Sequence, residues 1–394
     1  MPESNDILEI RQSVRQLCAK YGEDYWLQLD RERGFPTEFV SELTTSGFLT
    51  VLIPEEYGGA GLGVYEASII MEEVCRSGAH AGACHAQMYV MGSVLRHGSD
   101  AQKKAYLPKI AAGELRLQSF GVTEPTTGTD TTSLKTVARR DGDNYIINGQ
   151  KVWISRIEHS DLMVLLARTT AKNEVAKKTD GLSAFIVDVR EAAGNGLEIR
   201  PIESMINHHS CELFFDDLVL PKENLLGEEG KGFSYIMQHF ALERLIMGVN
   251  AHARAEYAID YALQYMKERE AFGKKLNEFQ ALRHKVVEMV SQVEMCKTFN
   301  YNIAFNMDRG DYVVKEASMS KLMGTKMADE VIYDCLQLLG GYGYMEDYPL
   351  ARLYRDSRLG PIGGGTSEIL KEIIAKMVID KKTYKPATKN LQED

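Results

Sequence analysis

The sequence lacks any regular cysteine spacing. Its six cysteines are scattered along 394 residues, and none forms a C-x-x-C pair. Disulfide frameworks and zinc sites both depend on recurring cysteine spacings, so neither is expected. Scattered cysteines are typical of reduced thiols, and the expected location is cytoplasmic. The six are Cys18, Cys75, Cys84, Cys211, Cys296 and Cys335.

The sequence also lacks long hydrophobic runs and a cationic leader. Residues 1–6 are polar and acidic, and apolar runs such as residues 161–168 are far too short to span a bilayer. We therefore expect no secretory signal and no membrane partner.

Basic residues are not in excess. The formal net charge is −10 and the isoelectric point is near 5.5, which argues against a nucleic-acid partner. A local basic patch could still bind an acidic ligand. The histidines show no ligand spacing, so no metal site is predicted; those considered are His80, His85, His208 and His209.

The sequence does contain three segments with different periodicities, which predict an α+β multi-domain fold. Residues 1–117 have helical spacing of apolar residues and predict an N-terminal α-helical domain. Residues 118–228 hold short β-rich runs separated by turn signals, as in a middle antiparallel β-domain. Residues 229–394 return to long helical periods and predict a C-terminal α-helical bundle.

Local signals refine these three predictions. We expect turns at Asp141-Gly142 and Asn148-Gly149, and a surface loop over residues 169–181, which are polar and rich in lysine. Two apolar stripes are expected on bundle helices. The first comprises Phe279, Leu282, Val286, Val287, Val290 and Val293, and the second Met327, Val331, Cys335 and Leu338.

A glycine-rich segment at residues 58–63 follows an apolar run, but it does not fit a dinucleotide-binding fingerprint. Pro54 and two glutamates separate the glycines from the apolar run, whereas the fingerprint joins a strand directly to a helix. A plain turn is the better interpretation. Taken alone, the hydroxyl-rich segment 120–130 is a capped turn, Trp153 fills a core, and residues 269–274 form a charged helix end capped by Gly273.

The C-terminal run makes a family resemblance visible. Several of its segments closely resemble the acyl-CoA dehydrogenase family. They are Gln337, the glycine- and tyrosine-rich run 340–344, Tyr354-Arg355-Asp356 and Gly365-Thr366-Ser367-Glu368. The resemblance extends over essentially the whole chain. It implies a flavin held between the β-domain and the bundle, and usually a homotetramer.

The family's catalytic glutamate is not at its usual place. Most members carry it just before the Gly-Thr pair, where this chain has Gly364. A smaller branch, which includes isovaleryl-CoA and long-chain acyl-CoA dehydrogenases, has it on an upstream helix before an arginine, and Glu243-Arg244 matches that pattern. A glutamate beside an arginine is usually half of a salt bridge. The apolar residues around Glu243 instead favour burial and a raised carboxylate pKa, as a general base needs.

The resemblance also assigns the cofactor, FAD, to separated segments. The 120–130 loop resembles the family's T-E-P-x-x-G-[ST]-D loop, with Gly128 serving a backbone conformation that other residues resist. Residues 156–158 depart from the Asn-Gly or Asn-Ala that is common after W-I-[TS]. The implied cofactor-binding residues are Phe120, Val122, Thr123, Gly128, Thr129, Trp153, Ser155, Arg269, Phe272, Gln280, Gln337, Gly341, Thr366 and Glu368.

The resemblance implies flavin-dependent α,β-dehydrogenation of a saturated acyl-CoA thioester to trans-2-enoyl-CoA. Glu243 would take the α-proton, the flavin would take the β-hydride, and the Gly364 N–H would polarise the thioester oxygen. Substrate contacts are implied for Thr129, Arg244 and Gly365. Electrons would pass to an electron-transferring flavoprotein. Two alternatives stay open: a flavin oxidase of the same fold that uses dioxygen, and a catalytically silent homologue acting as a binding protein.

Overall fold

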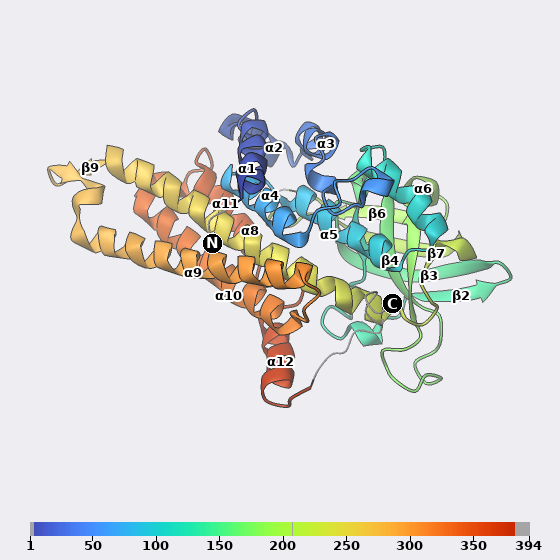
Figure 1. Ribbon diagram of the computed structural model, residues 1–394. Helices are drawn as coiled ribbons and strands as arrows, with labels where there is room; N and C mark the ends of the chain where they lie inside the picture. The colour runs from blue at the N-terminus through green and yellow to red at the C-terminus, as the bar shows by residue number, and fades with distance from the viewer. Residues whose placement is uncertain (1–3, 207, 383–394) are drawn as a thin grey trace.

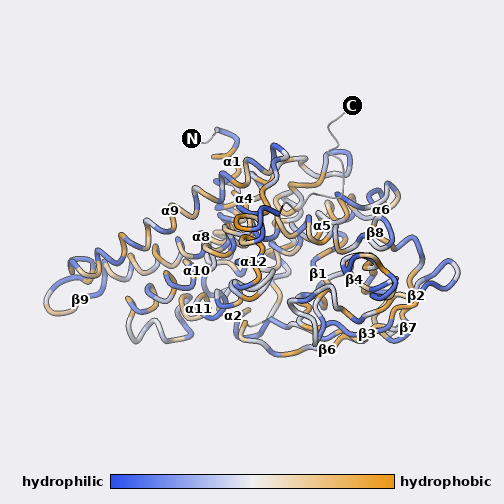
Figure 2. The backbone as a smooth tube through the Cα atoms, turned by 90° about the horizontal axis from the view of Figure 1, so that it is seen from below, coloured by the Kyte–Doolittle hydropathy of each residue, from blue (hydrophilic) through white to orange (hydrophobic). Residues whose placement is uncertain are grey.

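The computed structural model describes residues 4–206 and 208–382. The molecule is elongated, with a β-sheet domain at one end and a helical bundle at the other (Figures 1 and 2). The N-terminal helices lie over the junction between them (Figure 1). The α+β fold class expected from the sequence is confirmed, because helical, β and helical segments follow one another along the chain.

Six α-helices form the N-terminal segment. Helix α5 is buried over most of its length, and it packs against both strand β1 and helix α8. It therefore lies at the centre of the domain junction. The helices are α1 (Asn5–Cys18), α2 (Glu23–Glu32), α3 (Thr37–Thr45), α4 (Val64–Arg76), α5 (Gly82–His97) and α6 (Asp100–Ala111).

The β-domain is one main sheet, with strand order β6-β7-β3-β2-β4-β5-β8 and β1 beside β4. Most pairs are antiparallel, but β1 and β2 each pair with β4 in parallel. The strands are β1 (Leu117–Gly121), β2 (Val137–Asp141), β3 (Asn144–Ser155), β4 (Leu162–Arg168), β5 (Leu182–Asp188), β6 (Leu197–Ile202), β7 (Ser210–Pro221) and β8 (Leu225–Leu226).

One of the two predicted turns is correct. Asp141-Gly142 begins the hairpin that joins β2 to β3. Asn148-Gly149 is not a turn: it lies inside β3, where the register with β7 shifts and Gly149 has a φ of 147°. Thr136 lies where a side chain on Gly149 would project, so the Asn-Gly pair marks a β-bulge. The predicted loop at residues 169–181 is confirmed as a connection between β4 and β5.

The C-terminal bundle consists of long helices that pack along one another. They are α8 (Gly232–Glu268), α9 (Gln280–Asp308), α10 (Val314–Leu339), α11 (Pro349–Ser357) and α12 (Ser367–Val378). The second predicted apolar stripe is buried between them. The first stripe is only partly covered, and Val287 is 63% exposed. None of the helices in the described part of the chain is both long and apolar enough to cross a membrane.

A small hairpin closes the far end of the bundle. After α8 ends at Glu268, β9 (Glu270–Ala271) and β10 (Lys274–Lys275) pair through a turn formed by Phe272 and Gly273, both at positive φ. Gly273 therefore belongs to a hairpin and is not a helix cap, because α8 ends at Glu268 and its C-cap is Arg269. Phe272 is 97% exposed at the tip of this hairpin.

Candidate active site

Glu243 lies in the N-terminal third of α8, where the helix crosses the domain junction. The residue is 8% exposed, and its Oε2 atom has no hydrogen-bond partner among the described residues. Burial raises the pKa of this carboxyl to about 7, although the charges of Arg244, Lys321 and Arg156 oppose the rise. A carboxylate with this pKa is suited to accept a proton near neutral pH.

Gly364 lies directly against the Glu243 carboxyl, although 121 positions separate them in the sequence. A Cβ atom on Gly364 would be 3.2 Å from Glu243 Oε1 and 2.9 Å from Met247 Sδ. Gly364 also has a φ of +62°, which favours glycine. The two positions that the sequence singled out therefore meet at one point in space.

Lys321 of α10 is a further part of this site that the sequence analysis missed. The side chain is fully buried, and its Nζ donates a hydrogen bond of 2.6 Å to the carbonyl oxygen of Gly365. Burial lowers the pKa of the amine to about 8, although Glu243 opposes this. One signal was available, because Lys321 shares a helical face with the buried residues Ala317 and Ala328, four and seven positions away.

Arg244 points to the same turn from the other side. Its Nη1 donates to Ser318 Oγ at 3.4 Å, and its guanidinium carbon lies 5.4 Å from the ring centre of Phe240. Nη2 would be 3.9 Å from a Cβ on Gly365. Lys321 therefore holds the residue that follows Gly364, and Arg244 lies beside it. Helix α12 begins immediately after this turn with Thr366 as its N-cap.

The hydroxyl-rich loop after β1 is anchored by a buried ion pair. Glu124 accepts hydrogen bonds from the Lys135 and Thr136 amides at 2.6 and 2.9 Å and from Lys151 Nζ at 2.9 Å. Lys151 also donates to the Val122 carbonyl at 3.0 Å. These bonds hold the loop against β3, which also carries Trp153 and Ser155.

Trp153 is uncovered in the structure. The indole is 62% exposed at a backbone φ of +59°, and it lies beside Gly128, whose added Cβ would be 3.9 Å from its ring. An exposed tryptophan at a domain junction presents a flat surface suited to stacking on a heterocycle. The expectation for Gly128 is wrong in one respect, because its φ is not in the left-handed region; here the glycine leaves room next to the indole.

The other predicted cofactor residues fall into two groups. The first group lies on β1, on the loop that follows it, on β3 with Trp153, or at the start of α12. It comprises Phe120, Val122, Thr123, Thr129, Ser155, Thr366 and Glu368. The remaining residues lie toward the distal part of the bundle. Figure 1 shows the β9 hairpin at the opposite end of the molecule from β2. The second group comprises Arg269, Phe272, Gln280, Gln337 and Gly341.

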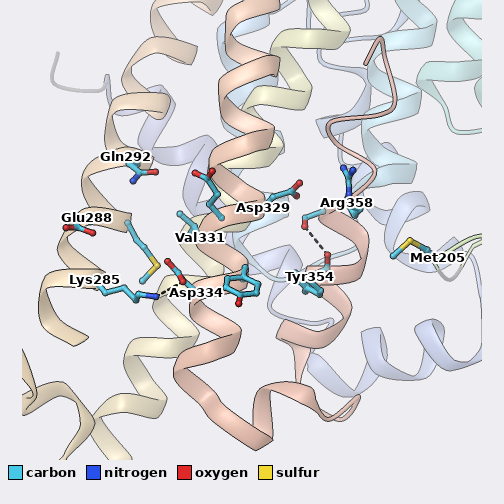
Figure 3. A pocket seen from close by; sticks show the side chains of 13 residues that line it. Met205, Lys285, Glu288, Gln292, Asp329, Val331, Asp334, Tyr354 and Arg358 are labelled. Atoms are coloured by element: carbon cyan, nitrogen blue, oxygen red, sulfur yellow. Dashed lines mark hydrogen bonds and ion pairs between the residues drawn. The ribbon is translucent and has the colours of Figure 1, made fainter. Parts of the chain in front are cut away.

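A cavity of about 710 Å³ lies elsewhere, between α9, α10 and α11. Figure 3 shows charged residues in its lining, including the ion pair between Lys285 and Asp334 at 2.5 Å. Neither Glu243 nor Trp153 lines this cavity. It is therefore separate from the site at the domain junction.

A helical domain, a β-sheet domain and a bundle that meet around a buried carboxyl define a three-domain enzyme. Family models of the acyl-CoA dehydrogenase N-terminal, middle and C-terminal domains match residues 4–114, 119–218 and 230–379. The chain therefore belongs to the acyl-CoA dehydrogenase family, whose members are flavin-dependent oxidoreductases.

Individual relatives agree with this assignment. Mitochondrial isovaleryl-CoA dehydrogenase of Pongo abelii is 32% identical, over 94% of this chain and 89% of the relative. The 3-(aryl)acrylate reductase of Clostridium sporogenes is 34% identical, over 94% of this chain and 97% of the relative. The crystal structure of an acyl-CoA dehydrogenase from Geobacillus kaustophilus superposes with a TM-score of 0.90 at 33% identity. The superposition covers 96% of this chain and 99% of the other.

Proposed function

We propose that this enzyme dehydrogenates a saturated acyl-CoA thioester at the α and β carbons, with Glu243 as the base. The observation that carries the proposal is the contact between Glu243 and Gly364, where the side chain of one fills the space left by the other. The pKa of about 7 supports the same role. The pairing of Glu243 with Arg244 favours the branch of the family with its base on the upstream helix.

Each residue of the site has a defined task in this proposal. Glu243 accepts the α-proton. The Gly364 N–H donates a hydrogen bond to the thioester oxygen, and this bond strengthens as negative charge develops on the oxygen. The hydrogen bond from Lys321 to the Gly365 carbonyl fixes the turn that presents this N–H, and Arg244 lies beside that turn. Thr129 and Gly365 line the path of the thioester. The acidity of the α-proton therefore depends on a turn that the buried Lys321 holds in place.

FAD fits the uncovered Trp153 and the loop beside it. The cofactor would contact Phe120, Val122, Thr123, Thr129, Trp153 and Ser155 in one subunit, and when bound it supplies the acceptor for the β-hydride. Gly128, Thr366 and Glu368 would border it. We further propose an electron-transferring flavoprotein as the acceptor of its electrons.

The purified protein should be yellow, with the visible absorption of an oxidised flavin. Under anaerobic conditions, a panel of saturated acyl-CoA thioesters should bleach it, because the α-proton and β-hydride leave together. A colourless protein that FAD cannot reconstitute would contradict the cofactor. A yellow protein that no thioester bleaches would contradict the reaction, and rapid peroxide formation in air would favour an oxidase.

We also expect a homotetramer. Arg269, Phe272 and Gln280 are too far along the bundle to serve the flavin beside Trp153 of the same subunit (Figure 1). Exposed apolar side chains on the bundle, such as Val287 and Phe272, would be covered by neighbouring subunits. Light scattering should give four times the chain mass of 44.2 kDa. A stable monomer fully loaded with flavin would be incompatible with this assembly.

A further inference from the structure

Arg156 is a cation at the active site that the proposed reaction does not use. It follows the Trp153-Ile154-Ser155 run at the end of β3, with a backbone φ of +62°. Its Nη2 lies 3.0 Å from the point that a Cβ on Gly82 would occupy, and Gly82 is the first residue of α5. The guanidinium therefore reaches from the β-domain to the beginning of the helix that packs against α8.

The Arg156 guanidinium has no counter-ion among the described residues. No ion pair or hydrogen bond joins it to any of them. Apart from three histidines, the side chains whose charge acts on it are Tyr89, Cys84, Arg254 and Glu243. Of these, only Glu243 can supply negative charge near neutral pH, and the proposed reaction needs that carboxylate for the substrate's proton.

The neighbouring histidines do not supply negative charge either. The pKa values of His85 and His208 fall to about 3, chiefly because of burial and further because of the Arg156 charge. Both ring nitrogens of His208 are buried without a partner among the described residues. His80, the third, faces Asp356 at 3.8 Å. The rings of His85 and His208 are thus neutral near Arg156, and among the described residues the two His208 nitrogens have no partner that a ligand would have to displace.

Such an arrangement favours an anionic ligand. A partly buried cation without a partner is costly, and a carboxylate would offset that cost through two parallel hydrogen bonds to the guanidinium fork. The unpartnered His208 nitrogens add polar contacts beside it. Because the charges of Arg156 and Glu243 act on each other, an anion bound at Arg156 would lie near the carboxyl that takes the proton.

We infer that Arg156 selects acyl-CoA thioesters whose acyl chain ends in a carboxylate. This inference rests on the proposed acyl-CoA dehydrogenation, and it names the class of substrate for that reaction. The thioester end would lie against Gly364 and Glu243, and the terminal carboxylate would bind Arg156 between β3 and α5. Glu243 stays free to accept the α-proton, because the substrate provides the counter-ion.

The test compares matched pairs of thioesters on the holoenzyme: butyryl-CoA with succinyl-CoA, pentanoyl-CoA with glutaryl-CoA, and hexanoyl-CoA with adipoyl-CoA. The dissociation constant is measured by calorimetry, and kcat/KM from flavin reduction. In at least one pair, the carboxylate should be preferred by about 10²-fold, as expected for two charge-assisted hydrogen bonds. Arg156→Met should abolish that preference, so that both members of the pair bind alike, and Arg156→Lys should keep part of it.

A matched control is Arg139→Met, which removes an exposed arginine from β2 and should change neither member of any pair. Equal affinity for both members of every pair would overturn the inference. An equal loss of affinity for both members of a pair in Arg156→Met would also overturn the inference, because the arginine would then act through Glu243 or the fold. The calorimetric comparison does not require turnover, so it decides the inference even if no thioester reduces the flavin.

Discussion

Replacing Glu243 with glutamine should slow flavin reduction by an acyl-CoA at least about 10²-fold, while the thioester still binds. Glutamine keeps the size of the side chain and fills the same buried space against Gly364. It cannot accept the α-proton. Single-turnover stopped-flow under anaerobic conditions measures the rate, and titration of the flavin spectrum measures binding.

Two comparisons make the Glu243→Gln result specific. Glu372→Gln changes an exposed glutamate of α12 and should leave the rate unchanged. In the unmodified enzyme the rate should rise as the pH passes through about 7, because Glu243 must lose its proton before it can act as a base. The residual rate of Glu243→Gln should lack this rise. An unchanged rate in the variant would mean that another residue is the base.

A glutamate placed at position 364 of the Glu243→Gln variant should restore part of the lost rate. The two positions face the same point, so a carboxylate on either can reach the same α-carbon. Recovery should be incomplete, because a side chain at 364 must adopt a φ of +62° and displace Met247. A small misplacement of a catalytic group is costly.

Replacing Lys151 with methionine should destabilise the β-domain by about 3 to 5 kcal/mol, because Glu124 would keep its charge in a buried position without a counter-ion. The pair is almost completely enclosed, and the lysine also donates to Val122 in the loop beside Trp153. Urea denaturation followed by the fluorescence of Trp153 and Trp26 measures the loss. Release of FAD should become faster at the same time, because this loop would lose its anchor.

Lys222→Met is the control for Lys151→Met. Lys222 forms a comparable ion pair of 2.7 Å with Asp143, but on the surface of the same domain, so its loss should cost about 1 kcal/mol or less. Adding Glu124→Gln to Lys151→Met should recover stability, since it removes the orphaned charge. If both lysine variants lost the same small amount of unfolding free energy, the buried ion pair would not be the anchor of the loop.

The sequence predicted the order of the elements because period and turn chemistry are local properties. It failed at Asn148-Gly149, where an Asn-Gly pair that is typical of a hairpin turn lies inside a strand. The difference is set by Thr136 on the neighbouring segment, which approaches Gly149 too closely for a side chain. Periodicity also could not separate the buried stripe on α10 from the one on α9 that includes exposed Val287, because both are apolar.

The candidate site was predictable only as far as motifs reach. Gly364 was found because it departs from the family's usual pattern, and Glu243 because it matches the pattern of a smaller branch. Lys321 was missed, since a lysine is normally read as a solvent-exposed residue, and only the packing of α10 against the turn after Gly364 buries it. That Arg156 has no counter-ion among the described residues could not be predicted either, because this depends on the surroundings and not on the residue.

The close approach of Gly364 to Glu243 constrains how such an enzyme can evolve. If a mutation added a glutamate at 364 while Glu243 remained, two carboxyl groups would share one buried space, and one of them would stay protonated. If Glu243 were lost first, the chain would have no base. Moving the base from one position to the other therefore requires two coordinated substitutions, at 243 and at 364.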